Sequence, residues 1–223
     1  IEEVVEYIKN NSAVSDVEIR KFVAERYEKY YLISDRQKSI VAFGDDTANV
    51  HFYAERSRKL KNGDLIMIDI WAKLAEKGAP FADITWMLYY GKRLPAEYDA
   101  AFRMVVQARD GAISFLKNKL RNKILPTGKE VDAAARNYLE KRGCGENFLH
   151  GTGHSLGFSK PHGARTKINR KGRSPLPLNV GYTIEPGVYF KNKFGVRSEI
   201  DFYIDENYKL IITSKIQKKI INI

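Results

Sequence analysis

Two of the four histidines in this chain lie four residues apart in a glycine-rich stretch, His150-Gly151-Thr152-Gly153-His154. Four carboxylates elsewhere stand in apolar or turn contexts that suit a buried site: Asp69 in Ile-Asp-Ile-Trp, Asp83 in Ala-Asp-Ile-Thr, Glu185 in Ile-Glu-Pro-Gly and Glu199 in Arg-Ser-Glu-Ile. Structural zinc prefers thiolates and imidazoles in a closed tetrahedron, whereas carboxylates with one imidazole suit harder divalent ions. The pattern therefore predicts a centre for two divalent cations.

The carboxylates form two equally spaced pairs. Asp69 and Asp83 are 14 residues apart, as are Glu185 and Glu199, and each pair straddles a predicted hairpin turn. In an antiparallel hairpin this spacing can place both acids on the same face of neighbouring strands. Two such pairs facing each other would repel strongly, and bound cations would remove that cost. The repetition predicts an internally duplicated β scaffold.

Hydrophobic periodicity and turn residues predict the elements that must position these side chains. We expect helices over residues 2–10, from the cap Ser15, from Pro95, and over about 128–141. We expect strands over residues 39–44, 65–71, 81–90, 181–190, 195–203 and 210–212. His51 follows a loop after the first of these strands, where functional residues are common.

Length and composition limit the class of protein. The 223 residues suffice for one large domain or two small ones, and 43% hydrophobic residues can fill a sizeable core. The net charge of +11 raises the question of a nucleic-acid partner, but the basic residues are scattered and form no recognisable binding module. A solvated basic surface is the expected interpretation, and nucleic acid is disfavoured as a partner.

Cysteine content and hydropathy predict a location. Cys144 is the only cysteine, so the chain can form no intrachain disulfide and no cysteine-based metal site, which fits a reducing cytoplasm. No apolar run approaches the length of a membrane span, and the acidic amphipathic start does not resemble a signal peptide. We expect a cytoplasmic protein without a membrane partner. Because the first residue is Ile1, the translation start lies outside this sequence.

These motifs resemble the pita-bread metallopeptidases, a family that includes methionine aminopeptidase, aminopeptidase P, prolidase and the non-peptidase creatinase. The resemblance runs from Ser15 to the C-terminus and rests on five residues in the order of the family's metal ligands: Asp69, Asp83, His154, Glu185 and Glu199. It implies an α+β fold in which an antiparallel sheet has an internal pseudo-twofold and covering helices. It also implies a single catalytic domain over residues 1–223, without the N-terminal domain of prolidase-like relatives.

The resemblance also implies roles at the site. Two divalent ions per chain are expected, manganese or cobalt first and iron or zinc as alternatives. Asp83 and Glu199 would bridge the ions, Asp69 would chelate one, and His154 with Glu185 would hold the other. The implied catalytic residues are His51, His150, His162 and Glu185. His162 comes eight residues after His154, one residue later than usual, and Gly163 stands where the family has a glutamate.

Three positions bear on the subfamily. A histidine four residues before the metal histidine, as His150 stands to His154, is similar to prolidase and aminopeptidase P. Arg197, two residues before Glu199, is similar to an arginine that meets substrate in those enzymes. The implied substrate-binding residues are thus His51, His150 and Arg197. Trp86 and Ile200 depart from the family pattern, in which a basic residue and an acid are expected at these positions.

The implied function is a dinuclear metallo-exopeptidase that hydrolyses the Xaa-Pro bond of dipeptides or of peptide N-termini. A peptide substrate and a possible homodimer follow from the same resemblance. The alternatives are methionine aminopeptidase, creatinase-like chemistry, and a pita-bread binding module that has lost catalysis. Metal content and release of proline from a peptide panel would separate them.

Overall fold

The computed structural model describes residues 1–35, 39–53 and 57–223, without the side chain of Arg165. Within these residues the α-helices are α1 (Glu2–Asn10), α2 (Asp16–Lys29), α3 (Ala96–Arg121) and α4 (Gly128–Glu140), with short 3-10 turns η1 (Gly44–Ala48) and η2 (Gly145–Asn147). The strands are β1 (Leu32–Ile33), β2 (Ile40–Phe43), β3 (Leu65–Leu74), β4 (Ala82–Tyr89), β5 (Gly153–Leu156), β6 (His162–Ile168), β7 (Gly181–Ile184), β8 (Gly187–Phe190), β9 (Phe194–Arg197), β10 (Ile200–Ile204), β11 (Leu210–Ile212) and β12 (Ile221–Asn222).

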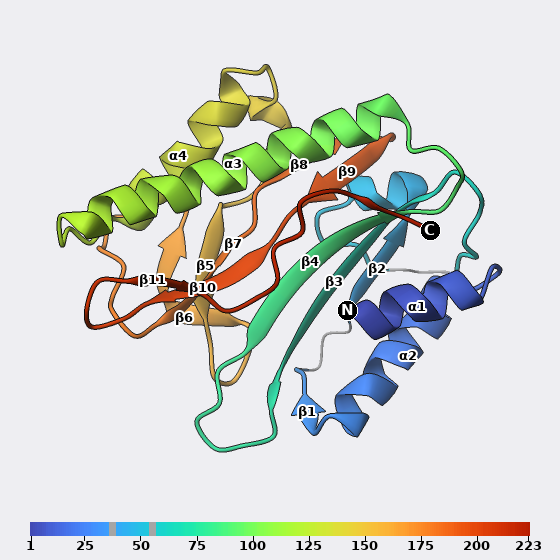
Figure 1. Ribbon diagram of the computed structural model, residues 1–223, viewed down its shortest axis with the longest axis horizontal. Helices are drawn as coiled ribbons and strands as arrows, with labels where there is room; N and C mark the ends of the chain where they lie inside the picture. The colour runs from blue at the N-terminus through green and yellow to red at the C-terminus, as the bar shows by residue number, and fades with distance from the viewer. Residues whose placement is uncertain (36–38, 54–56) are drawn as a thin grey trace.

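The first half of the fold is a sheet built around the long β3–β4 hairpin. In the described residues β3 pairs with β1, β2 and β4, and β12 adds to β4 as a parallel strand from the C-terminus. Helices α1 and α2 pack beside this sheet (Figure 1). Their apolar residues Val4, Ile8 and Ile19 share a core with Ile66 and Ile68 of β3. Because strand side chains alternate between faces, this core takes the even-numbered face of β3.

The second half repeats this plan with a second sheet. Its strand order is β11-β10-β7-β5-β6, and β8 and β9 form a separate hairpin beside it. The long helix α3 crosses this half of the molecule, and α4 lies next to it (Figure 1). Apolar residues of α3 and α4 share one core with Met67 and Trp71, from the odd-numbered face of β3. The hairpin β3–β4 therefore lies between the two cores, and the α+β fold with a repeated plan is as predicted.

Local signals placed the helix boundaries well. Ser15 caps α2 with a full capping box, in which its hydroxyl accepts from the Glu18 backbone N–H and the Glu18 carboxylate accepts from the Ser15 backbone N–H. Pro95 precedes the first turn of α3, where its missing N–H is tolerated. No helix in the described residues is both long enough and apolar enough to cross a membrane.

The predicted continuous strands over 181–190 and 195–203 were wrong. The pairing between β7 and β10 stops at Ile184 and Ile200, and a different pairing begins between β8 and β9. Pro186 has no N–H for a ladder, and the Glu185 N–H donates to the Thr152 carbonyl at 2.7 Å instead. Glu185 and Glu199 therefore lie at a break between two pairings, where their side chains can turn into the interior.

Candidate metal centre

Asp69 and Asp83 come from neighbouring strands of the β3–β4 hairpin. Asp69 lies opposite Thr85, and Asp83 lies opposite Trp71, so all four side chains are on one face. Both acids are buried, with 8% and 5% of their surface exposed. The predicted placement of this acid pair on one face is confirmed. The Asp83 backbone N–H donates to a carboxylate oxygen of Asp201 at 2.9 Å, which ties β4 to β10 of the other sheet.

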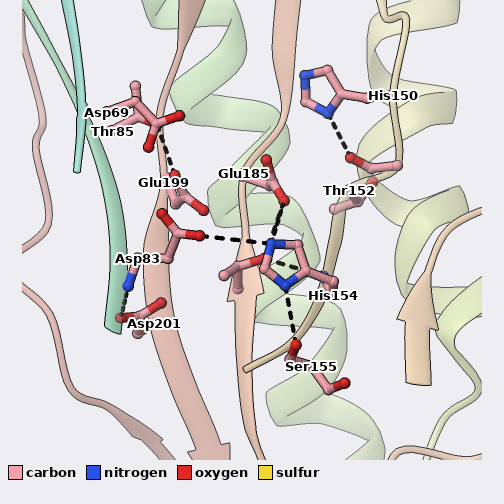
Figure 2. Close-up of polar contacts among 12 residues, drawn as sticks. Asp69, Asp83, Thr85, His150, Thr152, His154, Ser155, Glu185, Glu199 and Asp201 are labelled. Carbon is pink, nitrogen blue, oxygen red and sulfur yellow. Dashed lines mark hydrogen bonds and ion pairs between the residues drawn. The ribbon is translucent and has the colours of Figure 1, made fainter. Parts of the chain in front are cut away.

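His154 meets the acids from β5. Its Nε2 lies 3.3 Å from Glu185 Oε1 and 3.8 Å from Asp83 Oδ2. Figure 2 shows Asp83, Glu185 and Glu199 converging on this ring. The close approach of β5 to β7 requires Gly153, the residue before His154. A Cβ at this position would lie 2.1 Å from the Thr183 carbonyl oxygen. The glycine in the histidine stretch thus lets β5 bring His154 to the acids.

Three groups of side chains have ligand atoms within 4.8 Å of one another in the described residues. They are Asp69 with Asp83 and Glu199, His154 with Glu185 and Glu199, and Asp83 with His154 and His162. Glu199 belongs to two of these groups, and so does Asp83. The five predicted ligands are therefore gathered in one place, and the two acids predicted to bridge are the ones shared between groups.

The hydrogen bonds of His154 and Asp69 fit bound cations. The His154 Nδ1 lies 3.1 Å from the Ser155 carbonyl, which can only accept, so Nδ1 carries the proton. The Nε2 lone pair then faces carboxylates, an arrangement that repels unless a cation lies between them. Asp69 Oδ1 is buried and has no hydrogen-bond partner in the described residues. Imidazole nitrogen with several carboxylate oxygens is a donor set that suits divalent ions such as manganese, cobalt, iron or zinc.

The electrostatics of the acids point the same way. Burial, with repulsion from the neighbouring acids, raises the pKa of Asp83 and of Glu199 well above the ordinary values. Burial also raises the pKa of Glu185 and lowers the pKa of His154. Both kinds of shift mean that the ionised forms are disfavoured in the protein alone. Divalent ions would offset this cost, because they favour ionised carboxylates and a neutral imidazole.

Arg197 is the positive group that faces the acids. Its guanidinium forms an ion pair with Asp69, and its Nε donates to Thr85 Oγ1 at 2.9 Å. The Thr85 hydroxyl donates in turn to Glu199 Oε2 at 2.7 Å. Arg197 is only 3% exposed, so its contacts lie mainly within the protein. The structure therefore places Arg197 against one of the predicted metal-ligand acids and, through Thr85, next to a second, and its predicted substrate contact stays a prediction.

His150 lies at the end of a chain of hydrogen bonds that starts at Arg197. Arg197 donates to the Tyr189 hydroxyl at 3.0 Å, and that hydroxyl lies 2.8 Å from His150 Nε2. The His150 Nδ1 lies 2.8 Å from the Gly151 carbonyl and must be its donor, so Nε2 accepts from Tyr189. Burial lowers the pKa of His150 to about 3, so its ring is neutral at neutral pH. Both ring nitrogens have partners inside the protein.

The other predicted histidines line the same cavity. This cavity has a volume of about 730 Å³, and its wall includes His51, His162, Lys160 and Lys167 together with the five predicted metal ligands. His51 and His162 are exposed to it, and the His162 ring centroid lies 4.0 Å from that of His154. The structure thus brings together every predicted site residue in or beside one cleft large enough for a short peptide.

Sequence reasoning missed a buried ion pair that holds the histidine loop. Asp132 and Arg136 are one turn apart on α4, with side chains 2% and 8% exposed and an N···O distance of 2.8 Å. Arg136 donates to the His150 carbonyl at 2.7 Å, and Asp132 accepts from the Thr152 N–H at 3.0 Å and hydroxyl at 2.8 Å. The i,i+4 pairing of opposite charges next to the apolar Val131 was the available signal.

Three further polar partners also escaped prediction. Thr85, Thr183 and Asp201 contact Glu199, Glu185 and the Asp83 backbone, respectively. Each lies two residues from a predicted ligand in the sequence. For Thr85 this spacing was a usable signal, because Thr85 and Asp83 lie in the same strand, where side chains two residues apart share a face.

The sequence and the fold both match known proteins. The family described as metallopeptidase family M24 matches residues 1–206. An uncharacterized peptidase of Staphylococcus epidermidis is 27% identical over 200 residues, which cover 90% of this chain and 53% of that protein. The chain thus spans about half the length of that relative.

Two solved structures are similar over nearly the whole chain. The X-Pro aminopeptidase of Thermotoga maritima has a TM-score of 0.86 at 29% identity, covering 99% of this chain and 58% of that one. The Xaa-Pro dipeptidase of Bacillus anthracis has a TM-score of 0.83 at 26% identity, covering 100% of this chain and 58% of that one. The shared region is the one that carries the acids, His154 and the cleft.

Proposed function

We infer the function of this protein from the fact that its chain belongs to metallopeptidase family M24. We propose that it is an exopeptidase with a dinuclear metal centre, and that it hydrolyses the Xaa-Pro bond of dipeptides or of peptide N-termini. The observation that carries the proposal is the pair of ligand groups that share Glu199, one completed by Asp69 and Asp83 and the other by His154 and Glu185. The proposed domain is the whole of residues 1–223.

The five gathered side chains are the proposed ligands of two divalent ions, manganese or cobalt in preference to iron or zinc. Such ions supply activation of a water molecule near neutral pH and polarisation of the scissile carbonyl. The protein's own part is to hold the ligands in place. Thr85 fixes the Glu199 carboxylate, Thr183 donates to Glu185 Oε1 at 3.2 Å, and the Ser155 carbonyl fixes the ring of His154.

Around this centre we propose that His51 and His162 contact the substrate, because both are exposed to the cleft beside the ligands. His150 belongs to the proposed catalytic and substrate-binding residues, and Arg197 to the proposed substrate-binding residues. The two are linked to each other through the Tyr189 hydroxyl. Glu185 is the proposed proton carrier, since it is half-buried and its Oε1 reaches the cleft next to His154.

The preference for proline rests on the solved relatives and on the chemistry of the bond. An Xaa-Pro bond is a tertiary amide with no N–H, so an enzyme must recognise the ring by shape and the flanking groups by polar side chains. The two solved relatives described above are an X-Pro aminopeptidase and an Xaa-Pro dipeptidase. The cleft carries both apolar and basic groups suited to such a substrate, among them Trp71 and Lys167.

The test is a comparison of hydrolysis rates on matched peptides after loading with manganese or cobalt. We expect Met-Pro and Met-Pro-Ala to be cleaved faster than Met-Ala and Met-Ala-Ala, and we expect a chelator to abolish cleavage. Preference for the Met-Ala peptides would move the assignment to methionine aminopeptidase. If the protein binds two ions but cleaves no peptide, creatinase-like chemistry is favoured. If it neither binds metal nor cleaves any peptide, a binding module is favoured.

A cytoplasmic location and a homodimer belong to the same proposal. The lone cysteine, Cys144, is buried and free, in keeping with a reducing compartment. Sedimentation equilibrium of the metal-loaded protein would test the dimer, and cell fractionation would test the location.

A further inference from the structure

A buried arginine, Arg109, lies on α3, the long helix that crosses the second half of the molecule (Figure 1). It is the largest fully buried side chain in the described residues, with 0% of its surface exposed. A charged group loses hydration on burial, so a buried guanidinium needs hydrogen-bond partners inside the protein. The position of Arg109 is therefore fixed by the groups to which it donates.

In the described residues, four hydrogen bonds hold the Arg109 guanidinium. Its Nη1 donates to Ser198 Oγ at 2.6 Å and to the Gln217 carbonyl at 2.7 Å. Its Nε and Nη2 both donate to Asp110 Oδ1, at 2.9 and 2.8 Å. The Asp110 side chain is 55% exposed, whereas Ser198 and Gln217 are buried. The interior end of this group of contacts is thus formed by Ser198 and Gln217.

Ser198 links α3 to both segments that carry the second acid pair. It directly precedes Glu199, which lines the metal-centre cleft. The Ser198 side chain instead accepts from Arg109 on α3, as expected where successive side chains of an extended backbone point to opposite sides. The Ser198 backbone N–H donates to the carbonyl of Pro186, the residue after Glu185, at 3.2 Å. One buried serine therefore contacts the backbone beside each acid.

This contact lies where regular strand pairing is interrupted. The pairing of β7 with β10 ends at Ile184 and Ile200, and the pairing of β8 with β9 lies on the other side of the break. The backbone at Glu199 is thus not held by a continuous ladder, and contacts outside the ladder must fix its direction. Ser198 makes two such contacts, with Arg109 and with Pro186.

We propose that Arg109 is a positioning residue for the metal centre, which holds the Glu199 backbone in place through the Ser198 hydroxyl. This inference rests on the proposed function, because it takes Glu199 as a ligand of the bound ions. In a purely structural role, Arg109 would only fasten α3 to the C-terminal segment through Gln217, whose side chain bonds the backbone of Met87 on β4. The two roles differ at Ser198, because only the positioning role needs that contact.

Ser198→Ala tests the contact with the smallest change. It removes the acceptor and leaves the bonds from Arg109 to Gln217 and Asp110. We expect the manganese affinity to fall about tenfold in calorimetry, as for other partners that orient metal ligands. Asp110→Asn is the matched control, because it changes another partner of Arg109, keeps Oδ1 as an acceptor and leaves Ser198 untouched. Its manganese affinity should equal that of the wild-type protein.

A double-mutant cycle shows whether Arg109 acts through Ser198. Arg109→Met removes the donors and keeps a long unbranched side chain. The double variant should lose no more manganese affinity than Arg109→Met alone, because either change already breaks the same contact. Urea unfolding of the metal-free variants measures their stability separately. If Arg109→Met does not fold, Ser198→Ala still decides the question.

The outcomes separate this inference from the proposed function. If the wild-type protein binds two ions and Ser198→Ala binds them with unchanged affinity, the positioning role is overturned and the metal centre stands. Additive losses of affinity in the double variant would also overturn it, since Arg109 would then act by another route. If the wild-type protein binds no divalent ion, the metal centre itself is overturned, and this inference with it.

Discussion

One arginine and the hydroxyl of Thr85 organise two of the acids at the level of single residues. Arg197 pairs with Asp69 and reaches Glu199 through the Thr85 hydroxyl. Among the buried and half-buried side chains of the described site, the one positive charge of Arg197 faces the four predicted ligand carboxylates, and divalent ions would neutralise the remaining negative charge. Both His51 and His150 line the cleft, but His51 is exposed, whereas His150 is half-buried and has both ring nitrogens engaged.

Glu199→Gln should remove most of the activity and lower the metal content while leaving the fold intact. A neutral amide is a poor bridge between two cations, but it can still accept the hydrogen bond from Thr85. Elemental analysis and turnover on Met-Pro measure the effect. Glu206→Gln is the matched control, because Glu206 is exposed and its substitution removes the same negative charge. Full metal occupancy with full turnover in Glu199→Gln would refute the ligand assignment.

Arg197→Lys separates a positioning role from a substrate contact. Lysine cannot reproduce a fork that reaches Asp69, Thr85 and Tyr189 together. We expect metal affinity to fall roughly 10- to 100-fold, as for other residues that orient metal ligands. Hydrolysis of proline and non-proline peptides should then fall together. A loss confined to proline peptides, with metal affinity unchanged, would instead support direct contact with substrate.

At the level of elements, α4 and the loop before β5 form one unit. A capping box starts α4, in which Thr127 Oγ1 accepts from the Glu130 N–H at 3.2 Å and Glu130 accepts from the Thr127 N–H at 2.8 Å. The helix then presents Asp132 and Arg136 to the backbone of the loop. The position of His154 thus depends on a helix that contributes none of the predicted metal ligands.

Asp132→Asn should destabilise the protein by about 3–5 kcal/mol, the usual cost of breaking a buried ion pair. The reason is that Arg136 stays buried without its counter-charge. Urea unfolding of the metal-free protein gives the free energy of unfolding. Asp99→Asn is the matched control, because Asp99 and Arg103 form an i,i+4 pair on α3 with side chains 34% and 65% exposed. That control should cost no more than about 0.5 kcal/mol. Equal effects of the two substitutions would contradict a special role for the buried pair.

At the level of the whole molecule, two half-folds meet at the metal centre. The β3–β4 hairpin contributes Asp69 and Asp83, and the second half contributes His154, Glu185 and Glu199. Each half brings buried negative charge to the contact between them. Metal binding should therefore affect the stability of the whole fold.

Metal-free protein should be less stable at pH 8 than at pH 7. The pKa values of Asp83, Glu185 and Glu199 are raised in the folded state, so these groups retain protons at pH values where the unfolded chain has lost them. The lowered pKa values of His150 and His154 act in the opposite direction, but only up to about pH 7, where unfolded histidine is already mostly neutral. Above pH 7 the free energy of unfolding therefore falls as pH rises. Manganese at 100 times its dissociation constant should add about 2.7 kcal/mol. The gain should be larger at pH 8, because the ligands must lose protons to bind. Thermal unfolding at both pH values, with and without metal, measures this, and a metal-free protein that is more stable at pH 8 would contradict it.

Local patterns in the sequence determined a large part of this protein. The helix starts at Ser15 and Pro95 follow from capping and from the missing proline N–H, which act within a few residues. The shared face of Asp69 and Asp83 follows from the two-residue period of strands across one hairpin. The five predicted ligands were also readable locally, since each stands in its own short motif.

Only the tertiary structure decided which distant groups meet. Arg197 and Asp69 are 128 residues apart, and no local period links them. The break between β7 and β8 depends on Thr152, which directly precedes β5. Its carbonyl accepts the hydrogen bond from the Glu185 N–H. Contacts of this kind are set by packing between elements, and the spacing of residues along the chain carries no record of them.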